Sequence, residues 1–378
     1  MNVLFAAGGT GGHVFPSIAV ARALVAADPS LTPVFVGTRD CLEGRLVPEA
    51  GFELHHVDVL PLPRRLSPAI LKVPGALRTA IRRCHVIIEA TGAQAAVTFG
   101  GYVSFPLARA ASKDGLPLVV HEQNAVPGVA NQIAARWADR IAVSFAASAE
   151  RFAHPERCAV TGNPVREEIL RSELAETRAG AVRRFRLDPR RRTLLVFGGS
   201  QGARSLNRAV VDALLLWQRP DRIQILHAAG RALHPEALRA WEQAYAGATT
   251  GPVVRCIDFI DDMASAYAAA DVVVCRAGAT SFAELTALGK ASVLVPLPHA
   301  TRDHQRHNAE ALVHAGGALL IADDELNGRT LVAAAEPLLD DDTRRDEVAS
   351  AARAMGRRDA ADNVARLVLQ QLARVGAL

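Results

Sequence analysis

Residues 2–13 read Asn-Val-Leu-Phe-Ala-Ala-Gly-Gly-Thr-Gly-Gly-His, and residues 193–203 read Thr-Leu-Leu-Val-Phe-Gly-Gly-Ser-Gln-Gly-Ala. Each stretch is a short apolar run, typical of a buried parallel strand, followed by a glycine cluster and a segment of helical periodicity. Glycine permits a positive φ at such a turn, and the start of the following helix offers N–H groups and a partial positive charge. Two turns of this kind at corresponding positions predict phosphate binding in two similar halves of the chain.

Apolar strand-like runs alternate with helical segments on either side of these turns. The runs are residues 3–7, 33–37, 95–99, 118–121, 140–144 and 158–161, then 193–197, 223–228, 253–259, 272–275 and 292–296. This alternation predicts βαβ units around parallel sheets, and 378 residues suit two domains better than one. A basic, poorly patterned stretch at 171–192 interrupts the alternation, so we place the domain junction within 162–192 and expect 183–192 to be a solvated linker.

Composition narrows the class of ligand and the compartment. The formal net charge of +4 is mild, and three Tyr and three Trp offer few rings for base stacking, so nucleic acid is disfavoured as a partner. Five scattered cysteines show neither a disulfide framework nor a zinc ligand set, which fits a reducing cytoplasm. We also expect no cleaved signal peptide and no spanning helix.

The glycine turns do not match the common nucleotide motifs. A dinucleotide-binding domain needs an acidic residue at the end of its second strand, and the nearest acid, Asp40, lies beyond a glycine turn. The Gly-x-Gly-x-x-Gly spacing is absent, which disfavours NAD and FAD and with them a nicotinamide oxidoreductase. Neither turn contains lysine, which excludes a Walker A loop.

The second half contains a further anion-binding pattern. Residues 275–284 follow a strand and open a helix with small and hydroxyl side chains. Glu284 lies in the first turns of this helix, where its carboxylate either accepts the two hydroxyls of a ribose or simply favours the helix dipole. Asp261 and Asp262 are either metal ligands or a helix cap, and we favour a cap because no further carboxylate is close in sequence.

Residues 59–88 combine basic and apolar side chains. Ile70, Val73, Leu77 and Ile81 recur at helical spacing, and no acidic residue interrupts the segment. The six basic residues are Arg64, Arg65, Lys72, Arg78, Arg82 and Arg83. Basic charge beside an apolar stripe suits an anionic membrane surface, and the alternative is an amphipathic helix whose stripe faces the core.

Seven motifs in order resemble the MurG family of UDP-N-acetylglucosamine transferases, which convert lipid I to lipid II in peptidoglycan synthesis. They are residues 8–16, 100–104, 121–124, 162–166, 198–203, 259–263, and 303–305 followed by Asn308 and Ala309. The resemblance runs from residue 2 into the C-terminal region. Small departures occur in the middle of 279–284 and at Phe105.

The resemblance implies a GT-B fold, an α/β architecture of two Rossmann-like domains with parallel sheets facing across a cleft. It assigns 1–163 to an acceptor and membrane-binding domain, 164–345 to a UDP-sugar-binding domain, and 346–378 to a helical segment packing back on the first domain. The implied reaction is inverting transfer of N-acetylglucosamine from UDP-N-acetylglucosamine to undecaprenyl-diphospho-N-acetylmuramoyl-pentapeptide, lipid I, without a metal or other cofactor.

The family also implies a cellular setting. It implies peripheral attachment to the cytoplasmic face of the inner membrane, with an anionic membrane surface as partner. Roles in cell-wall biogenesis, cell shape, cell division and the cell cycle follow, together with contacts to cell-wall and division proteins.

By resemblance, the UDP donor lies mainly on the second domain. Ile260 is expected beside uracil, Glu284 on the ribose, and Gln305 on the sugar hydroxyls. The diphosphate and its surroundings are assigned to Ser200, Ala279, Thr280, Ser281, Phe282 and Ala283. Arg166 is expected at the nucleotide, and Arg276 or Arg166, with fixed N–H groups, would stabilise the departing UDP.

The acceptor is assigned to the first domain. The turn of Thr10, Gly11 and Gly12 is expected near a diphosphate or the transferred sugar. The cleft is expected to be lined by His13, Tyr102, His121, Glu122, Asn124 and Asn131. Inversion needs a group that removes the proton of the acceptor hydroxyl, and His13 is the first choice because imidazole titrates near neutral pH.

Alternatives stay open for these roles. His13 is either the base or a neutral hydrogen-bond donor to phosphate, and Glu122 is either a second candidate base or a structural orienter. A UDP-sugar 2-epimerase on the same fold is the competing enzyme, although it would need carboxylates around the sugar and would leave the acceptor loops without a purpose. A non-catalytic sugar-nucleotide sensor is also compatible with the sequence.

Overall fold

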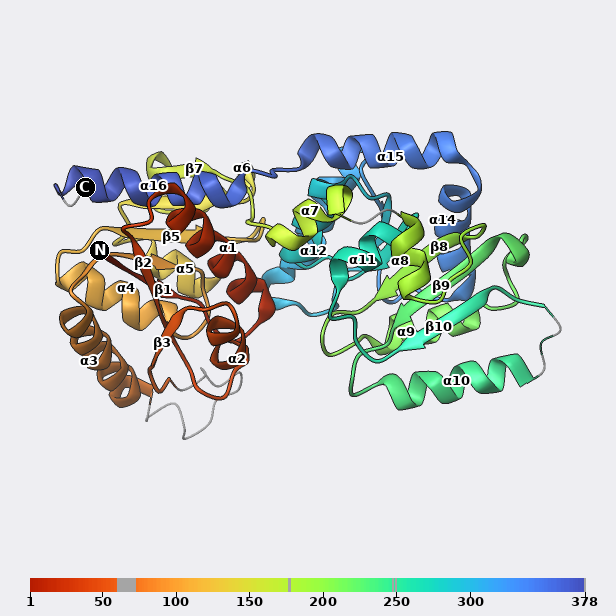
Figure 1. Cartoon of the computed structure of the whole chain (residues 1–378), viewed down its shortest axis with the longest axis horizontal. Coiled ribbons are helices and arrows are strands. Elements are labelled where there is room, and N and C mark those ends of the chain that lie inside the picture. Colours follow the sequence, from red (N-terminus) through yellow and green to blue (C-terminus); the bar gives the residue numbers. More distant parts are fainter. Residues whose placement is uncertain (60–72, 176–177, 247, 249, 377–378) are drawn as a thin grey trace. The chain divides into compact units, whose positions relative to one another are not determined.

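A computed structural model describes residues 1–59, 73–175, 178–246, 248 and 250–376. The chain forms two compact units, which we treat separately (Figure 1). The first unit comprises Met1–Arg166 and Arg357–Leu378, and the second comprises Glu167–Gly356. The chain therefore leaves the first unit after Arg166, against the expected boundary at 163/164, and returns at Arg357, against an expected C-terminal segment starting at residue 346.

The first unit is built on a seven-stranded sheet in the order β3-β2-β1-β4-β5-β6-β7, with parallel pairing throughout. Its strands are β1 (Asn2–Ala6), β2 (Thr32–Gly37), β3 (Glu53–His56), β4 (Ala93–Thr98), β5 (Leu118–Glu122), β6 (Arg140–Val143) and β7 (Cys158–Val160). Its helices are α1 (Gly11–Ala27), α2 (Leu42–Glu49), α3 (Val73–Thr91), α4 (Ser104–Lys113), α5 (Val129–Ala134), α6 (Ala146–Ala149) and α16 (Ala360–Arg374).

Helices cover both faces of this first sheet, which explains why its strands are nearly continuous apolar runs. Val3 and Phe5 of β1 face a core shared with α1 and α16, whereas Leu4 faces the core shared with α3 and α4. The C-terminal helix α16 lies beside α1 (Figure 1) and adds Val364 and Val368 to that core.

The second unit repeats the plan with six strands in the order β10-β9-β8-β11-β12-β13, again all parallel. Its strands are β8 (Arg192–Phe197), β9 (Ile223–Ala228), β10 (Val253–Ile257), β11 (Val272–Cys275), β12 (Ser292–Leu294) and β13 (Leu319–Leu320). Its helices are α7 (Glu167–Ala175), α8 (Arg178–Arg184), α9 (Arg204–Asp212), α10 (His234–Ala246), α11 (Met263–Ala269), α12 (Ala279–Leu288), α13 (His304–His314), α14 (Gly328–Asp340) and α15 (Asp342–Met355).

Both sheets have the strand order of a Rossmann fold, which confirms the predicted α/β class with two Rossmann-like domains. In each sheet the order reverses beside the first strand, between β1 and β4 and between β8 and β11. Ligands of open α/β sheets bind outside the carboxyl ends of the strands at such a reversal. The glycine turns that follow β1 and β8 lie at these two points.

The prediction of a solvated linker at 183–192 is wrong. The segment begins at the end of α8 and ends at the start of β8, and four of its arginines form ion pairs: Arg184, Arg190, Arg191 and Arg192. Arg184 bonds Asp262 at 2.6 Å, and Arg192 contacts Asp271 at 3.3 Å. Helix α8 also buries Ala181 and Val182, so the arginines occupy the polar face of packed structure.

The basic segment 59–88 is only partly described, because residues 60–72, with Arg64, Arg65, Ile70 and Lys72, lie outside the described residues. In α3 the residues Ala80, Cys84, Ile87 and Ile88 are buried in the core. Leu77 and Ile81 are half-buried, while Arg78, Arg82 and Arg83 are exposed. Part of the apolar stripe therefore faces the core. None of the described helices is both long and apolar enough to cross a membrane.

Candidate active site

The carboxyl ends of β1 and β4 bring two glycine loops together in the first unit. Gly9 has φ 89° and Gly101 has φ 83°, a conformation that favours glycine. A Cβ atom at Gly101 would collide with the carbonyl oxygen of Gly8. The loop after β4 therefore packs against the turn after β1, backbone to backbone.

His13 lies in the first turn of α1 with its ring turned back toward this turn. Its Nδ1 is 3.0 Å from the carbonyl oxygen of Gly8 and 3.3 Å from Thr10 Oγ1. Because a carbonyl oxygen only accepts, Nδ1 carries the proton, and Nε2 is the basic nitrogen of the neutral ring. This tautomer favours a base over a neutral donor to phosphate.

Gly100 keeps the space beside that basic nitrogen open. A Cβ atom at Gly100, whose φ is 92°, would lie 3.1 Å from His13 Nε2 and 3.4 Å from Asn131 Nδ2. Two residues predicted for the cleft, His13 and Asn131, thus flank one position. Any side chain at this glycine would therefore crowd both of them.

Glu122, the other predicted base, is 1% exposed at the end of β5. Its Oε1 accepts hydrogen bonds from the backbone N and Nδ2 of Asn124, at 2.9 and 3.2 Å. Its Oε2 accepts from Gly128 N at 3.0 Å and from Asn131 Nδ2 at 2.8 Å. Four bonds occupy the acceptor sites of the carboxylate, so the geometry suits an orienter of Asn124 and Asn131.

His121 is fully buried on the same strand rather than exposed to a ligand. Gln123 Nε2 donates to its Nδ1 at 3.1 Å, so Nε2 carries the proton and donates to Gly162 O at 3.2 Å. Burial lowers the pKa of His121 to about 4, although the bond to Gly162 opposes this shift. His121 is therefore neutral at physiological pH and holds the segment at 162–166 in place.

Arg166 and Tyr102 are the remaining predicted residues of the first unit. Arg166 lies with its guanidinium carbon 4.5 Å above the ring of Phe15 on α1, a cation–π contact. It thus belongs to the first unit, although the sequence assigned it to the second. Tyr102 is 46% exposed in the loop after β4.

A residue that the sequence analysis missed holds the glycine turn of the first unit. Glu43, in the first turn of α2, is 1% exposed, and its Oε2 accepts from Gly9 N at 3.1 Å. Its Oε1 accepts from the backbone N and the Oγ1 of Thr38, at 3.1 and 2.6 Å. Its sequence signal was weak, because Glu43 lies farther past the end of β2 than the ribose-binding acid of a dinucleotide-binding domain.

The glycine turn of the second unit is held without a charged group. Gly199 has φ 86° and Gly202 has φ 76°, and a Cβ atom at Gly202 would collide with the carbonyl oxygen of Ala229. Asn207 Nδ2 donates to the same carbonyl at 2.9 Å. Ser200 is exposed at the tip of the turn, as a ligand residue would be.

The start of α12 provides the second half of this strand-end site. Gly278 caps the helix in an extended conformation, and Thr280 and Ser281 are half-buried behind it. The hydroxyl of Thr280 is buried and has no hydrogen-bond partner among the residues the structure describes. A phosphate oxygen would satisfy it. The neighbouring predicted residues Ala279, Phe282 and Ala283 are buried.

Glu284 is 3% exposed and points into the same region of the second unit. The hydroxyl of Tyr267, a fully buried residue of α11, donates to its Oε2 at 2.9 Å. Tyr267 could not be predicted as a site residue, because an isolated tyrosine in an apolar helix is typical of the core. Ile260, assigned to uracil, is 4% exposed in the loop before α11.

Gln305 opens α13 beside a strained loop. Its Oε1 accepts from Leu297 N at 2.9 Å, which leaves the amide nitrogen as the donor for a ligand. Arg302 and Asp303, immediately before it, have φ values of 57° and 54°, which are unfavourable for side chains other than glycine. Strain of this kind gathers at ligand sites.

Arg276 is braced inside the second unit. Its guanidinium donates to Asp323 Oδ1 at 2.6 Å and to Ser205 Oγ at 2.9 Å, and it also reaches the carbonyls of Val295 and Pro296. Asp323 offsets its charge. This geometry ties the ends of β11 and β12 to α9 and favours positioning over direct stabilisation of a leaving group.

Of the Asp261–Asp262 pair, which was predicted to cap a helix, Asp262 is the N-cap of α11. Asp262 Oδ1 accepts from Ser265 N at 3.0 Å at the start of α11, and Asp261 lies 3.6 Å from Arg231. In the described part of the chain, no group of three or more His, Cys, Asp or Glu side chains is arranged to hold a metal.

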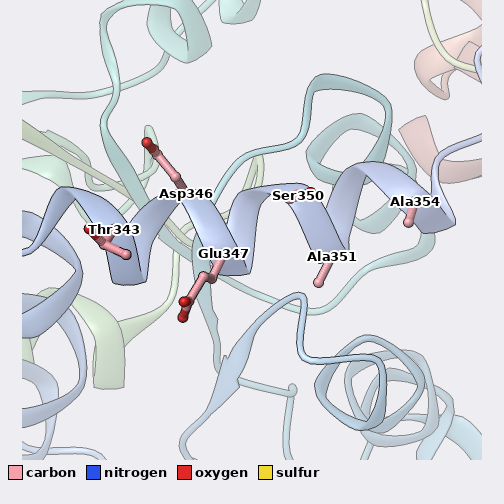
Figure 2. Close-up of a pocket in the computed structure, with 6 residues that line it drawn as sticks. All are labelled: Thr343, Asp346, Glu347, Ser350, Ala351 and Ala354. Carbon is pink, nitrogen blue, oxygen red and sulfur yellow. The ribbon is translucent and has the colours of Figure 1, made fainter.

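A separate pocket of about 700 Å³ lies on α15 (Figure 2). All its lining residues come from this one helix, and none belongs to the strand-end loops: Thr343, Asp346, Glu347, Ser350, Ala351 and Ala354. We assign it no role in the site.

Comparison with known proteins places the geometry in context. Residues 3–143 match the family model of the glycosyltransferase family 28 N-terminal domain, and residues 193–364 match that of the family 28 C-terminal domain. A curated relative from Acidothermus cellulolyticus is 44% identical over 374 residues, covering 99% of this chain and 98% of its own. It is named UDP-N-acetylglucosamine–N-acetylmuramyl-(pentapeptide) pyrophosphoryl-undecaprenol N-acetylglucosamine transferase.

Solved structures agree on the architecture. MurG from Acinetobacter baumannii is 28% identical, with a TM-score of 0.75 over 98% of this chain and 99% of its own. The UDP-GlcNAc 2-epimerase of Neisseria meningitidis, solved with UDP-GlcNAc, has a TM-score of 0.71 at 13% identity, covering 99% of this chain and 100% of its own. At that identity the second likeness shows the fold alone.

Proposed function

Because the chain belongs to glycosyltransferase family 28 and, within it, to the MurG transferases, we infer that it transfers N-acetylglucosamine from UDP-N-acetylglucosamine to lipid I, giving lipid II. It is a hexosyltransferase of peptidoglycan synthesis with the GT-B fold. Identity of 44% along 99% of the chain carries this conclusion. The distant epimerase likeness carries no comparable argument, since fold alone does not specify a reaction.

The first unit is proposed to bind the acceptor and supply the base. The acceptor hydroxyl would approach His13 Nε2, whose side of the ring is kept uncrowded by the missing side chain of Gly100. As the hydroxyl oxygen forms its bond to the anomeric carbon, its proton passes to Nε2. The bond from Nδ1 to Gly8 O, at 3.0 Å, then holds the imidazolium that forms.

The second unit is proposed to hold the donor. The N–H groups at the start of α12 and the Thr280 hydroxyl would bind the diphosphate, which departs with the electron pair of the broken sugar–oxygen bond. Glu284 would accept the ribose hydroxyls, and the Gln305 amide would donate to the sugar. Ser200 and Ile260 complete this proposed site, and Arg166 stays a proposed contact of the nucleotide.

We further propose that no metal ion takes part. The carboxylate pair weighed above as possible metal ligands makes other contacts: Asp261 pairs with Arg231, and Asp262 caps α11. Turnover should be unchanged when EDTA is added. It should also be unchanged when Mg²⁺ or Mn²⁺ is then added back, each at the same concentration. A rate that depends on the added ion would contradict this part of the proposal.

A peripheral position on the cytoplasmic face of the inner membrane is also proposed. Exposed Arg78, Arg82 and Arg83 on α3 form a basic surface that suits anionic lipid, at about 1 kcal/mol for each cation. Replacing all three by serine should weaken cosedimentation with anionic vesicles and leave turnover of a water-soluble acceptor analogue unchanged. Unchanged cosedimentation would exclude this face. Supply of lipid II would connect the protein to cell shape, division and the machinery of wall growth.

The reaction itself is tested with UDP-N-acetylglucosamine in the presence and absence of a lipid I analogue. Transfer predicts UDP release that depends on the acceptor, with one added sugar on the lipid product by mass spectrometry. Acceptor-independent formation of the 2-epimer would contradict it in favour of the epimerase. Binding of the donor without either product would favour a sensor.

A further inference from the structure

One peptide group links His13 to a buried acid. The carbonyl of Gly8 accepts from His13 Nδ1 at 3.0 Å, and the N–H of Gly9 donates to Glu43 Oε2 at 3.1 Å. That carbonyl and that N–H belong to the same planar, conjugated amide. Glu43, the peptide and His13 therefore form a continuous chain of hydrogen bonds that ends at the ring.

The fold holds Glu43 firmly in this position. Its other oxygen accepts from both the backbone N and the hydroxyl of Thr38. A Cβ atom at Gly37 would lie 2.7 Å from Glu43 Cγ, and one at Gly8 would lie 3.2 Å from its Oε1. Two glycines thus make room for a side chain that is 1% exposed. Among the described residues its hydrogen-bond partners are three donors, an environment that suits a carboxylate.

We propose that Glu43 is a positioning residue that acts through the Gly8–Gly9 peptide to orient His13 and strengthen the basicity of its Nε2. The carboxylate draws on the Gly9 N–H, which raises the negative charge on Gly8 O and improves it as an acceptor for Nδ1–H. Hydrogen bonds in a chain polarise one another in this way. In a Ser-His-Asp triad the carboxylate touches the imidazole directly, whereas here an amide stands between them.

The other titratable groups near His13 have different roles. His121 on β5 is neutral, because burial lowers its pKa to about 4. Glu122 on β5 is committed to four N–H donors, and Arg166 stacks on Phe15. Among the described residues, hydrogen bonds join Glu43 to the Nδ1 side of His13 through a single peptide.

The inference rests on the proposed role of His13 as base, and the Glu43→Gln variant tests it through the pH profile. The variant loses the negative charge, so His13 should become less basic. We expect kcat at neutral pH to fall about tenfold, as for other groups that support a reacting residue. The acidic limb of the kcat profile should move to lower pH, while KM for UDP-N-acetylglucosamine stays unchanged.

Thr38→Val is the matched control, because it removes a hydroxyl bonded to Glu43 at 2.6 Å and keeps the carboxylate. Its acidic limb should stay in place even if its rate falls. A Glu43→Gln enzyme that loses rate without moving its limb would overturn the proposal and reduce Glu43 to scaffolding.

A titration of the His13 ring by NMR separates this inference from the proposed function. In the full chain with labelled histidine, His13 should titrate at lower pH in Glu43→Gln than in the parent. An equal titration in the folded variant would overturn the coupling, whatever the turnover. Conversely, an active His13→Ala enzyme would remove His13 as base and leave the measured coupling standing.

The parent protein provides a readout that requires no variant. As His13 gains a proton, its Nδ1–H becomes a stronger donor, and the chain of hydrogen bonds should tighten toward Glu43. The Gly9 amide proton should then move downfield with the same midpoint as the His13 ring. A Gly9 signal that does not follow His13 would overturn the proposal, even if Glu43→Gln fails to fold.

Discussion

The two units use the same strand–turn–helix element and hold it in different ways. In the first unit the turn after β1 is fixed by a buried carboxylate, Glu43, on the N–H of Gly9. In the second unit the turn after β8 is fixed by close backbone packing at Gly202 and by the neutral amide of Asn207. The negative charge of Glu43 beside the first turn favours a basic His13. The turn after β8 has no such charge beside it among the described residues, and it can attract an anion.

The acidic residues differ in the same sense. Glu43 lies farther past the second strand than the ribose-binding acid of dinucleotide-binding domains, and it points inward. The acid assigned to the ribose here is Glu284, on a different helix of the other unit and braced by Tyr267. The shared strand order therefore places the loops at corresponding positions in the two units. The buried side chains beneath those loops determine which chemistry each loop supports.

The sharpest way to break this comparison is His13→Ala. Loss of a general base typically costs about 10²- to 10⁴-fold in rate. We expect kcat to fall within that range while UDP affinity, measured by calorimetry, stays the same, because the donor is assigned to the other unit. His85→Ala is the control, since His85 pairs with Asp114 on the surface of α3. Equal losses of turnover and UDP affinity would contradict the division of labour.

The glycine turns themselves can be compared by adding one methyl group to each. Gly202→Ala places a Cβ atom against Ala229 at a positive φ, whereas a Cβ atom at Gly9 meets nothing within 4 Å. We expect Gly202→Ala to cost roughly 2–5 kcal/mol of unfolding free energy and Gly9→Ala about 1–2 kcal/mol. Urea unfolding followed by circular dichroism measures both. A larger loss for Gly9→Ala would show that the first turn is the more tightly packed.

On the donor side the informative change is Glu284→Gln. Hydrogen bonds to a charged group contribute roughly 1.5–3 kcal/mol, so we expect UDP to bind about 10- to 100-fold more weakly. Turnover at saturating donor should change less, the reverse of His13→Ala. Tyr267→Phe serves as the companion variant, because it removes only the hydroxyl bonded to Glu284 at 2.9 Å. A turnover defect with normal UDP affinity would move Glu284 out of the ribose site.

Much of the fold was readable in the sequence, because parallel strands buried on both faces are apolar runs and glycine turns mark where they end. The strands β3 and β13 were missed, since the first contains two half-buried histidines and the second has two residues. The charge pattern of 183–192 was misread because the apolar face of α8 contributes only Ala181 and Val182.

The site was less predictable than the fold, because motif residues were visible but the residues that hold them were not. Glu43, Tyr267 and Asp323 act through hydrogen bonds to residues in other elements of the fold. No local periodicity encodes such a bond. Arg276 is the opposite case, because it was predicted to contact the ligand and the structure pairs it with Asp323 instead.

A buried histidine in each unit provides the finest test of the comparison. His227 on β9 accepts from Trp241 Nε1 at its Nδ1, at 3.1 Å, and its Nε2 lies 3.0 Å from Asn207 Oδ1. Likewise, His121 accepts from Gln123 Nε2 at its Nδ1, and its Nε2 lies next to the carbonyl oxygen of Gly162. Burial, with a smaller contribution from a nearby histidine, lowers the pKa of each to about 4. A proton on either ring would also oppose an N–H donor directed at Nδ1.

Stability should therefore fall as the solution is acidified. An unfolded histidine titrates near 6.5, so between about pH 6.5 and 4 the unfolded chain binds more protons than the folded one. Each residue should then remove up to about 1.4 kcal/mol of unfolding free energy for each pH unit of acidification. Replacing His227 with glutamine should remove one such contribution from the second unit, whereas His314→Gln, at an exposed position, should not. Urea unfolding at pH 7, 6 and 5 measures the slopes, and an unchanged slope in His227→Gln would mean that this ring is protonated without cost.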